Sequence, residues 1–424
     1  MMTLGDYEDM MDSCVRCSMC KFIPQLAIRS KRFSSICPSI DFYDFHAYSG
    51  GGRMIMANAY HKGRVELTPE MLDVLYRCTN CGGCEVSCKW VYDLEPNEAI
   101  HALRVAAVEA GAGPMPKHKK YIKLVERKKN PYGEEPENRP AWLTKDIKLD
   151  ESSDTLYFVG CTAAYRREEI AVATAKILNA AGEGFRIMGS DEQCCGSPVY
   201  RVGDEKRAIR IMKENIESFK RAGIKRIITS CSGCYNMFKI EYPRFVEHDI
   251  EIVHTSQLIE SLLKDGRLKL TKDVPMKVTY HDPCHLGRMA EPYEKWEGEK
   301  IEVLTLVYIY DPPKSERRGA HGVYDAPRNV LKQIPGIELV EMDRIREYSY
   351  CCGAGGGCKS AYPDFAQATA DERVEEAEST GADALVSACP FCGTNFRDSL
   401  KSRNSSMQYF DLTELVLRSI GGEQ

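Results

Sequence analysis

Short apolar runs alternate with helical patterns over the last two thirds of the chain. The runs are Leu156–Val159, Arg226–Thr229, Val278–Tyr280 and Ala384–Val386. A segment with helical periodicity, Ile170–Ala180, follows the first run and stops at Gly182. Strands that alternate with helices indicate α/β units built around a parallel sheet.

A cysteine follows each apolar run within a few residues. These cysteines are Cys161, Cys231, Cys284 and Cys389. The carboxyl ends of parallel strands share one edge of a sheet, and reactive groups of α/β proteins gather at that edge. We therefore expect the four cysteines to lie at the carboxyl edges of the parallel sheets and to take part in the function.

The first 125 residues show little strand signal. Apolar residues recur at helical spacing between Glu98 and Ala110, Asn97 is the predicted N-cap, and Gly111 and Pro114 end the helix. We predict a helical domain over residues 1–125. A polar stretch with three prolines follows, and we interpret residues 126–153 as a linker.

The C-terminal cysteine pattern occurs twice. Cys161, Cys194, Cys195, Cys231 and Cys234 (the first-copy site) recur as Cys284, Cys351, Cys352, Cys389 and Cys392 (the second-copy site). A repeat of this length indicates a duplicated domain. We expect an α+β multidomain protein: a helical N-terminal domain, then two homologous α/β cysteine-rich domains over residues 154–270 and 271–424.

The second copy contains an insertion near residues 289–320. Cys194 and Cys351 are 157 residues apart, whereas Cys161 and Cys284 are only 123 apart, which leaves about 34 extra residues. The insertion carries the apolar stretch Val303–Tyr310. An apolar strand without a counterpart either joins a sheet edge or meets another chain, and we expect a subunit contact.

Cysteine content separates this chain from ordinary globular proteins. It has 19 cysteines among 424 residues and a net charge of −5. The N-terminus is acidic and lacks the apolar segment of a secretory signal. We therefore expect the cysteines to bind metal and not to form a disulfide framework. The charge gives no reason to expect a nucleic-acid partner. We expect a cytoplasmic protein, and peripheral attachment to a membrane through a partner subunit stays open.

The first eight cysteines have ferredoxin spacing. Cys78, Cys81, Cys84 and Cys88 form a C-x2-C-x2-C-x3-C run, and the partner run is Cys14, Cys17, Cys20 and the delayed Cys37. In two-cluster ferredoxins the fourth cysteine of a run binds the other cluster. We therefore assign cubane [4Fe-4S] cluster one to Cys14, Cys17, Cys20 and Cys88, and cluster two to Cys37, Cys78, Cys81 and Cys84.

Zinc is the alternative metal, because C-x2-C pairs also form tetrahedral zinc sites. Two triplets, each with a lone fourth cysteine, favour clusters. The chain departs from the ferredoxin pattern in that Lys89, and not proline, follows Cys88.

The duplicated motif resembles a known family. Each copy contains an adjacent pair followed by glycine, Cys194-Cys195-Gly196 and Cys351-Cys352-Gly353, and the second copy also contains His281-Asp282-Pro283-Cys284-His285-Leu286-Gly287-Arg288. These motifs resemble the CCG domains of heterodisulfide reductase. With the ferredoxin-type N-terminus, the layout resembles the D subunit of that enzyme. It is also similar to iron–sulfur subunits of glycolate and glycerol-3-phosphate dehydrogenases and of class II benzoyl-CoA reductase complexes.

This resemblance implies a noncubane [4Fe-4S] cluster in each copy that keeps all five cysteines, as both copies here do. In heterodisulfide reductase such a cluster handles the disulfide substrate. Zinc remains open for the first-copy site, since its C-x2-C pair could supply half the ligands. Adjacent cysteines bind one tetrahedral ion poorly but can reach different irons, which favours a cluster.

Two functions follow. The chain is either an oxidoreductase subunit that passes electrons through two cubanes to thiol–disulfide chemistry, or a pure electron-transfer subunit with the chemistry on another chain. No flavin or nicotinamide fingerprint is present. Electrons must therefore come from a partner such as a flavoprotein, a hydrogenase-type subunit or a cytochrome b subunit, and a small thiol or disulfide is the expected substrate.

We assign catalysis to the second-copy site and electron relay to the first-copy site. The glycine run Gly353–Gly357 is expected to leave room for a substrate sulfur, whereas the first copy has the bulkier Gly196–Val199. Cys358 has no repeat partner and is interpreted as a spare thiol. His281 and His285 are expected to make local hydrogen bonds.

Overall fold

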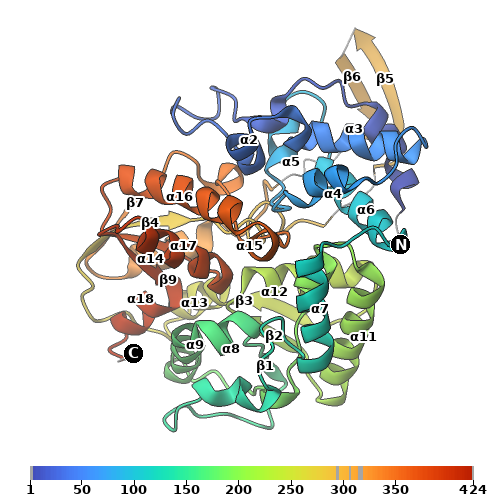
Figure 1. Cartoon of the computed structure of the whole chain (residues 1–424). Helices are drawn as coiled ribbons and strands as arrows, with labels where there is room; N and C mark the ends of the chain where they lie inside the picture. Colours follow the sequence, from blue (N-terminus) through green and yellow to red (C-terminus); the bar gives the residue numbers. More distant parts are fainter. Residues whose placement is uncertain (1–2, 293–295, 305–306, 314–318, 423–424) are drawn as a thin grey trace.

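The apolar runs form two separate parallel sheets (Figure 1). The first sheet has the order β1-β2-β3 and contains β1 (Thr155–Tyr157), β2 (Arg226–Thr229) and β3 (Glu251–His254). The second has the order β7-β4-β8-β9 and contains β4 (Met276–His281), β7 (Ile337–Val340), β8 (Ala384–Ser387) and β9 (Gln408–Asp411). The structure is a computed structural model that describes residues 3–292, 296–304, 307–313 and 319–422.

The N-terminal region is helical, as its pattern predicts. Its α-helices are α1 (Glu8–Asp12), α2 (Pro38–Tyr43), α3 (Gly50–His61), α4 (Pro69–Tyr76), α5 (Gly83–Cys88), α6 (Pro96–Glu109) and α7 (Pro116–Lys128). Short 3-10 turns lie at Leu4–Tyr7, Met19–Lys21 (η2) and His46–Tyr48. Six of the eight cysteines lie in loops and turns between these helices, and Cys84 and Cys88 lie within α5.

The predicted N-cap of α6 is wrong. The helix begins at Pro96, where a missing N–H costs nothing, and Glu95 is its N-cap residue. Asn97 lies inside the first turn, and its backbone N–H donates to the Glu85 carboxylate at 3.1 Å. The cap is therefore supplied by a residue of α5, which the local pattern could not show.

Helices surround both sheets. Those of the first cysteine-rich region are α8 (Cys161–Arg166), α9 (Glu168–Ala180), α10 (Ser197–Tyr200), α11 (Glu205–Arg221), α12 (Ser232–Asn236) and α13 (Thr255–Lys264), with 3-10 turns at Gly189–Asp191 and Tyr242–Arg244 and a π-helix at Met237–Glu241. Those of the second are α14 (Asp325–Gln333), α15 (Cys358–Ala361), α16 (Pro363–Ser379), α17 (Pro390–Ser402) and α18 (Leu412–Ser419), with a turn at Arg346–Tyr348.

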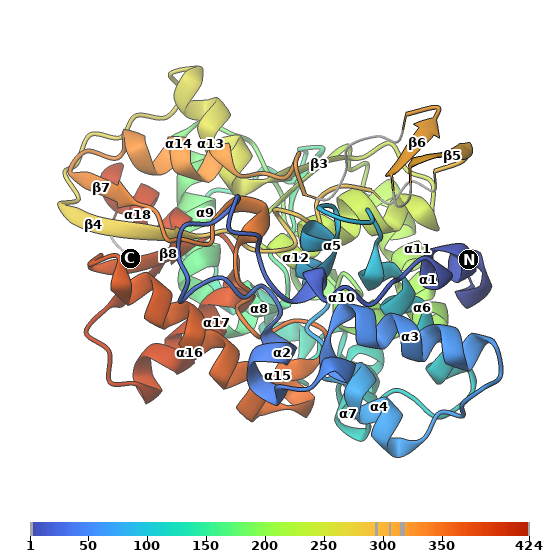
Figure 2. The same cartoon turned by 90° about the horizontal axis from the view of Figure 1, so that it is seen from above.

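The two cysteine-rich regions pack with approximate twofold symmetry. Helix α13 of the first copy packs against α14 of the second, and α18, the counterpart of α13, packs against α9 (Figure 2). A continuous apolar core joins buried residues of the N-terminal helices to both copies, from Leu4 to Val416. The three parts of the chain are therefore held as one packed unit.

Residues 126–153 are packed against the first copy. The segment contains the 3-10 helix η4 (Pro136–Trp142), in which Arg139 and Trp142 are buried. Arg139 donates to the buried carboxylate of Glu192 at 2.5 Å. This polar stretch thus supplies part of the wall of the first copy.

The insertion forms a hairpin apart from both main sheets. Strands β5 (Glu299–Leu304) and β6 (Val307–Asp311) pair antiparallel, with Ile301 opposite Ile309. The expectation of one strand is wrong because the run folds back on itself, and neither described strand joins the edge of a main sheet. Residues 293–295, 305–306 and 314–318 of the insertion lie outside the described residues.

Among the described residues, no helix is long and apolar enough to cross a membrane.

The hairpin generates a first prediction. Ile301 and Ile309 are 42% and 55% exposed, so changing both to Thr should alter the free energy of unfolding by no more than about 0.5 kcal/mol per site. The same variant should reduce co-purification of a partner subunit, because the exposed apolar face is lost. Thermal unfolding and affinity purification measure the two effects.

Leu385→Ala in β8 is the matched control. Leu385 is fully buried, so its truncation should cost about 2–5 kcal/mol. Intact partner binding by the Ile301→Thr/Ile309→Thr variant would contradict the subunit-contact prediction.

Candidate iron–sulfur sites

The cysteines assigned to cluster one gather around η2 and the start of α3. Burial raises the pKa of the Cys20 thiol, and the neighbouring thiols of Cys14 and Cys17 add to the increase. The Gly51 N–H donates to the Cys20 sulfur at 3.3 Å and opposes that shift. The structure therefore brings Cys14, Cys17 and Cys20 together. Cys88 is buried at the end of α5, which packs against η2.

The cysteines assigned to cluster two also lie together. Burial raises the pKa of Cys37, with further increases from Cys78 and Cys81. Burial likewise raises the pKa of Cys84, which has Cys78, Cys81 and Cys20 as neighbours. The delayed cysteine, Cys37, thus joins the second ferredoxin run, as the crossed assignment requires.

Two consecutive glycines separate the two groups. A Cβ on Gly50 would lie 2.7 Å from the Cβ of Cys84, and a Cβ on Gly51 would lie 3.6 and 3.7 Å from the sulfurs of Cys20 and Cys14. Glycine at the start of α3 therefore lets its backbone lie between the two groups.

The first-copy site collects cysteines from both ends of its domain. Neighbouring thiols shift one another's pKa in the order Cys161, Cys194, Cys195, Cys234 and Cys231. Hydrogen bonds from Cys194 and Cys234 lower the pKa of Cys195 to about 6. The adjacent cysteines thus have different partners, Cys161 on one side and Cys234 on the other.

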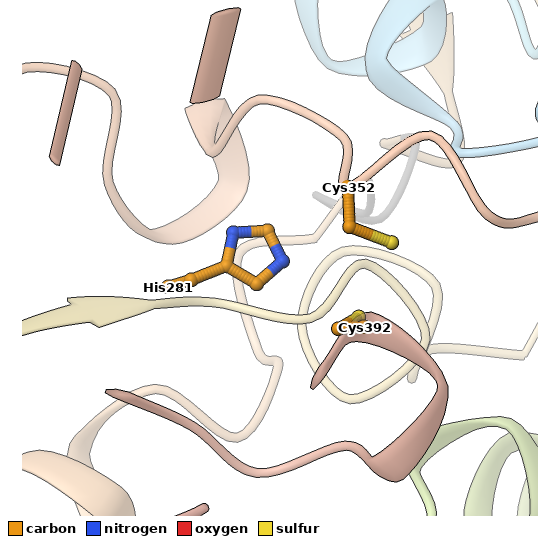
Figure 3. A group of neighbouring side chains, drawn as sticks. All are labelled: His281, Cys352 and Cys392. Atoms are coloured by element: carbon orange, nitrogen blue, oxygen red, sulfur yellow. The ribbon is translucent and has the colours of Figure 1, made fainter. Parts of the chain in front are cut away.

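The second-copy site repeats this arrangement. Its thiols are linked in the order Cys284, Cys351, Cys352, Cys392 and Cys389. Hydrogen bonds from Cys351 and Cys392 hold the pKa of Cys352 well below its usual value. His281 lies beside this site: one ring nitrogen and the sulfurs of Cys352 and Cys392 are within 4.8 Å of one another (Figure 3).

Three groups of cysteines form a row. The hydrogen bond from Cys351 holds the pKa of Cys81 well below its usual value, so the second-copy site adjoins the cluster-two cysteines. The hydrogen bond from Cys231 does the same for the pKa of Cys389, so the two copies also adjoin. The second-copy site lies between cluster two and the first-copy site. The second copy, and not the first, is thus the one that adjoins cluster two, whereas the predicted relay has the first copy feed the second.

The glycine run of the second copy does not leave open space. A Cβ on Gly355 would lie 2.6 Å from the Thr79 carbonyl oxygen, and one on Gly356 would lie 2.4 Å from the Cys78 carbonyl oxygen. The expected room for a substrate is occupied by the cluster-two loop. The glycines instead permit close approach of two backbones, and this contact holds the second-copy site beside Cys81.

These cysteine sets fit iron–sulfur clusters by the chemistry of their donors. Gly196 N–H donates to the Cys194 sulfur at 3.4 Å, and Gly353 N–H donates to the Cys351 sulfur at 3.3 Å. Equivalent backbone donors in both copies suit anionic sulfur ligands. Five thiols per site exceed the four that structural zinc takes.

Several arginines that the sequence analysis did not single out complete the sites. Arg139 donates to the Cys161 sulfur at 3.4 Å, and Arg288 donates to the Cys81 carbonyl at 2.6 Å. Arg328 forms a buried ion pair with Asp282, two residues before Cys284. Of these residues, only Arg288 and Asp282 lie within the motif His281–Arg288 of the second copy. The other positions became significant only through tertiary contacts.

Cys358 is outside all four groups. Burial raises its pKa to about 12, and its thiol donates to the Tyr76 carbonyl at 3.6 Å. This geometry agrees with a structural thiol.

Comparisons with known proteins identify the same two kinds of domain. The family model of the cysteine-rich CCG domain matches residues 155–239 and 307–397, and that of the 4Fe-4S dicluster domain matches residues 10–90. The D subunit of the dihydromethanophenazine:CoB–CoM heterodisulfide reductase of Methanosarcina mazei is 34% identical over 97% of this chain and 95% of its own length. The B subunit of the fumarate reductase (CoM/CoB) of Methanothermobacter marburgensis is 31% identical over 81% of this chain and 61% of its own.

A solved structure shares the fold. A hypothetical protein from Helicobacter pylori superposes with a TM-score of 0.53 at 10% identity, covering 89% of this chain and 68% of its own.

The fold and the cysteine sites define an iron–sulfur oxidoreductase subunit that carries [4Fe-4S] clusters. The chain belongs to the family of heterodisulfide reductase D subunits.

A prediction concerns the junction residue Cys81. Cys81→Ser should remove one cubane and slow reduction of the second-copy site, because Cys81 is both a proposed cluster-two ligand and a neighbour of Cys351. Iron and sulfide content and EPR of the reduced protein measure the loss. Cys358→Ser is the control and should keep all clusters; equal iron content in both variants would reject the ligand assignment.

A second prediction tests the glycine contact. Gly356 and Gly223 both have positive φ, 59° and 71°, but only Gly356 faces another backbone. Gly223→Ala should therefore lower the free energy of unfolding by about 1–2 kcal/mol, the cost of placing a side chain in the left-handed conformation. Gly356→Ala should cost more and slow electron transfer to the second-copy site. Equal losses of unfolding free energy would show that the close approach is unimportant.

Proposed function

We propose that this chain is the subunit of a redox complex that interconverts a disulfide and its two thiols, receiving or delivering electrons through its two cubane clusters. The observation that carries the proposal is the row of cysteine groups. Cys81 beside Cys351 and Cys231 beside Cys389 supply a continuous series of sulfur sites from the ferredoxin-type domain to both copies.

Such a series suits the chemistry of a disulfide. Cleavage of one S–S bond consumes two electrons and two protons and yields two thiols. Cubane clusters deliver electrons singly, so neighbouring redox centres that together hold two electrons match the demand. When bound, the clusters would supply electron storage and an iron binding site for sulfur.

The residues of the chain have defined parts in this proposal. The cluster-one ligands are Cys14, Cys17, Cys20 and Cys88, and the cluster-two ligands are Cys37, Cys78, Cys81 and Cys84. The catalytic set is Cys284, Cys351, Cys352, Cys389 and Cys392, and the first-copy set is Cys161, Cys194, Cys195, Cys231 and Cys234. The second-copy site is proposed as catalytic because it is the one that adjoins cluster two directly.

The names of two relatives support a substrate class. The Methanosarcina mazei and Methanothermobacter marburgensis relatives both carry CoM and CoB in their names. A mixed disulfide of two thiols is therefore the substrate that we propose for this chain. The relatives are subunits of redox complexes, and we propose a flavoprotein, hydrogenase-type or cytochrome b subunit as the electron partner.

The alternative is a pure electron-transfer subunit. Release of thiols from the CoM–CoB mixed disulfide by the isolated chain, with reduced methyl viologen as donor, would support the oxidoreductase. Reduction of the clusters without thiol release would support electron transfer alone. Iron and sulfide for only two clusters would favour zinc at a cysteine-rich site and end the disulfide proposal.

A prediction assigns the catalytic copy. Oxidation in the presence of a thiol substrate should produce a new paramagnetic signal that vanishes in Cys352→Ser and survives in Cys195→Ser. The two residues occupy equivalent positions, so each variant is the matched control of the other. The opposite pattern would transfer catalysis to the first copy, and absence of the signal in the natural chain would favour the electron-transfer subunit.

A further inference from the structure

His281 lies at the end of β4, three residues before Cys284. It is buried, and its ring packs edge-on against Phe396 with ring centroids 4.8 Å apart. The backbone of β4 and this ring contact hold the imidazole beside the second-copy site.

A hydrogen bond fixes the protonation state of this imidazole. The Arg373 Nε–H donates to His281 Nδ1 at 3.2 Å. The same guanidinium donates to Glu376 at 2.5 Å and to the Ser349 hydroxyl at 3.2 Å. An arginine can only donate, so Nδ1 is the unprotonated nitrogen and Nε2 carries the proton of the neutral ring.

The protonated nitrogen faces the cysteines. In Figure 3 the ring nitrogen farther from the backbone, Nε2, is directed towards Cys352 and Cys392. Nε2 is buried and has no hydrogen-bond partner among the residues that the structure describes. Buried N–H groups in proteins normally have an acceptor. A cluster bound between Nε2 and the two cysteine sulfurs would supply the acceptor that this N–H lacks.

Ligation by His281 is the competing interpretation, because the three side chains could also hold a metal ion. A neutral histidine that binds metal through Nε2 carries its proton on Nδ1. The Arg373 Nε–H then faces another N–H instead of an acceptor. The contact between Arg373 and Nδ1 therefore favours a hydrogen-bond donor over a ligand.

We propose that His281 is a positioning residue whose Nε2–H donates a hydrogen bond to the sulfurs of the second-copy cluster, and that Arg373 sets this tautomer. The inference depends on the proposed function only in requiring a cluster at Cys284, Cys351, Cys352, Cys389 and Cys392. Hydrogen bonds to the sulfurs stabilise the more negative, reduced cluster and so raise its reduction potential.

The first copy lacks this donor. Phe158 stands three residues before Cys161, as His281 stands before Cys284, and it is fully buried. Its ring packs against Phe238, with ring centroids 4.7 Å apart. The second copy therefore has a donor at a position where the first copy has none, whereas the first copy has a different donor, Arg139, on the Cys161 sulfur at 3.4 Å.

The test uses EPR redox titration of the full chain. His281→Phe, which introduces the residue of the first copy, should lower the ratio of reduced to oxidised second-copy cluster about tenfold at fixed potential, which is about 59 mV for a one-electron couple. His281→Gln keeps an N–H donor on a side chain of comparable reach and should restore most of the difference. Phe158→Leu is the control and should leave the second-copy potential unchanged.

A measurement on the natural chain covers the case in which the variants fold poorly. Protein labelled with ¹⁵N-histidine should show a weakly coupled nitrogen and an exchangeable proton at the reduced second-copy cluster. Strong nitrogen coupling would make His281 a ligand and overturn the inference.

Two further outcomes are distinguishable. An unshifted potential in His281→Phe with full iron content would overturn the inference and leave the proposed function standing. Iron for only two clusters in the natural chain would remove the proposed function and this inference together.

Discussion

The buried guanidinium of Arg104 is the contact on which the arrangement of the three parts depends. It donates to the carbonyls of Leu75 and Cys78 in the N-terminal region, of Arg201 in the first copy and of Gly356 in the second. Hydrogen bonds from a charged donor contribute about 1.5–3 kcal/mol each, more than neutral ones. Because one rigid group joins all three parts, the loop of Cys78 and the glycine run cannot separate independently.

This arrangement explains why the order of the sites differs from their order along the chain. Parallel strands place Cys284 and Cys389 at one sheet edge, and Gly355 and Gly356 let the cluster-two loop approach that edge. The first copy meets the same site from the other side through Cys231. Proximity, and not chain order, therefore gives the second copy its central position.

The features that could be predicted from the sequence are those that depend on residues close together along the chain. Strand, cysteine and helix succeed one another as the apolar pattern indicated, and the family and the α+β fold class are confirmed. Contacts between distant residues could not be predicted. Cys81 meets Cys351, and Arg373 reaches His281 over 92 residues, only because folded elements pack together. The order of the sites and the tautomer of His281 both depend on such contacts.

Duplication gave two domains with the same arrangement of cysteines. The residues that differ between the copies make the two cysteine sites unequal for electron transfer. Two identical clusters side by side would have equal potentials, and an electron would have no preferred position. In the second copy, backbone contact at Gly356 gives access to cluster two, and the proposed donor His281 favours the reduced state. The first copy has buried Phe158 at the equivalent position. The donor His281 thus acts on the site that an electron from cluster two reaches first, and two such electrons must gather before the S–S bond of a disulfide can be cleaved.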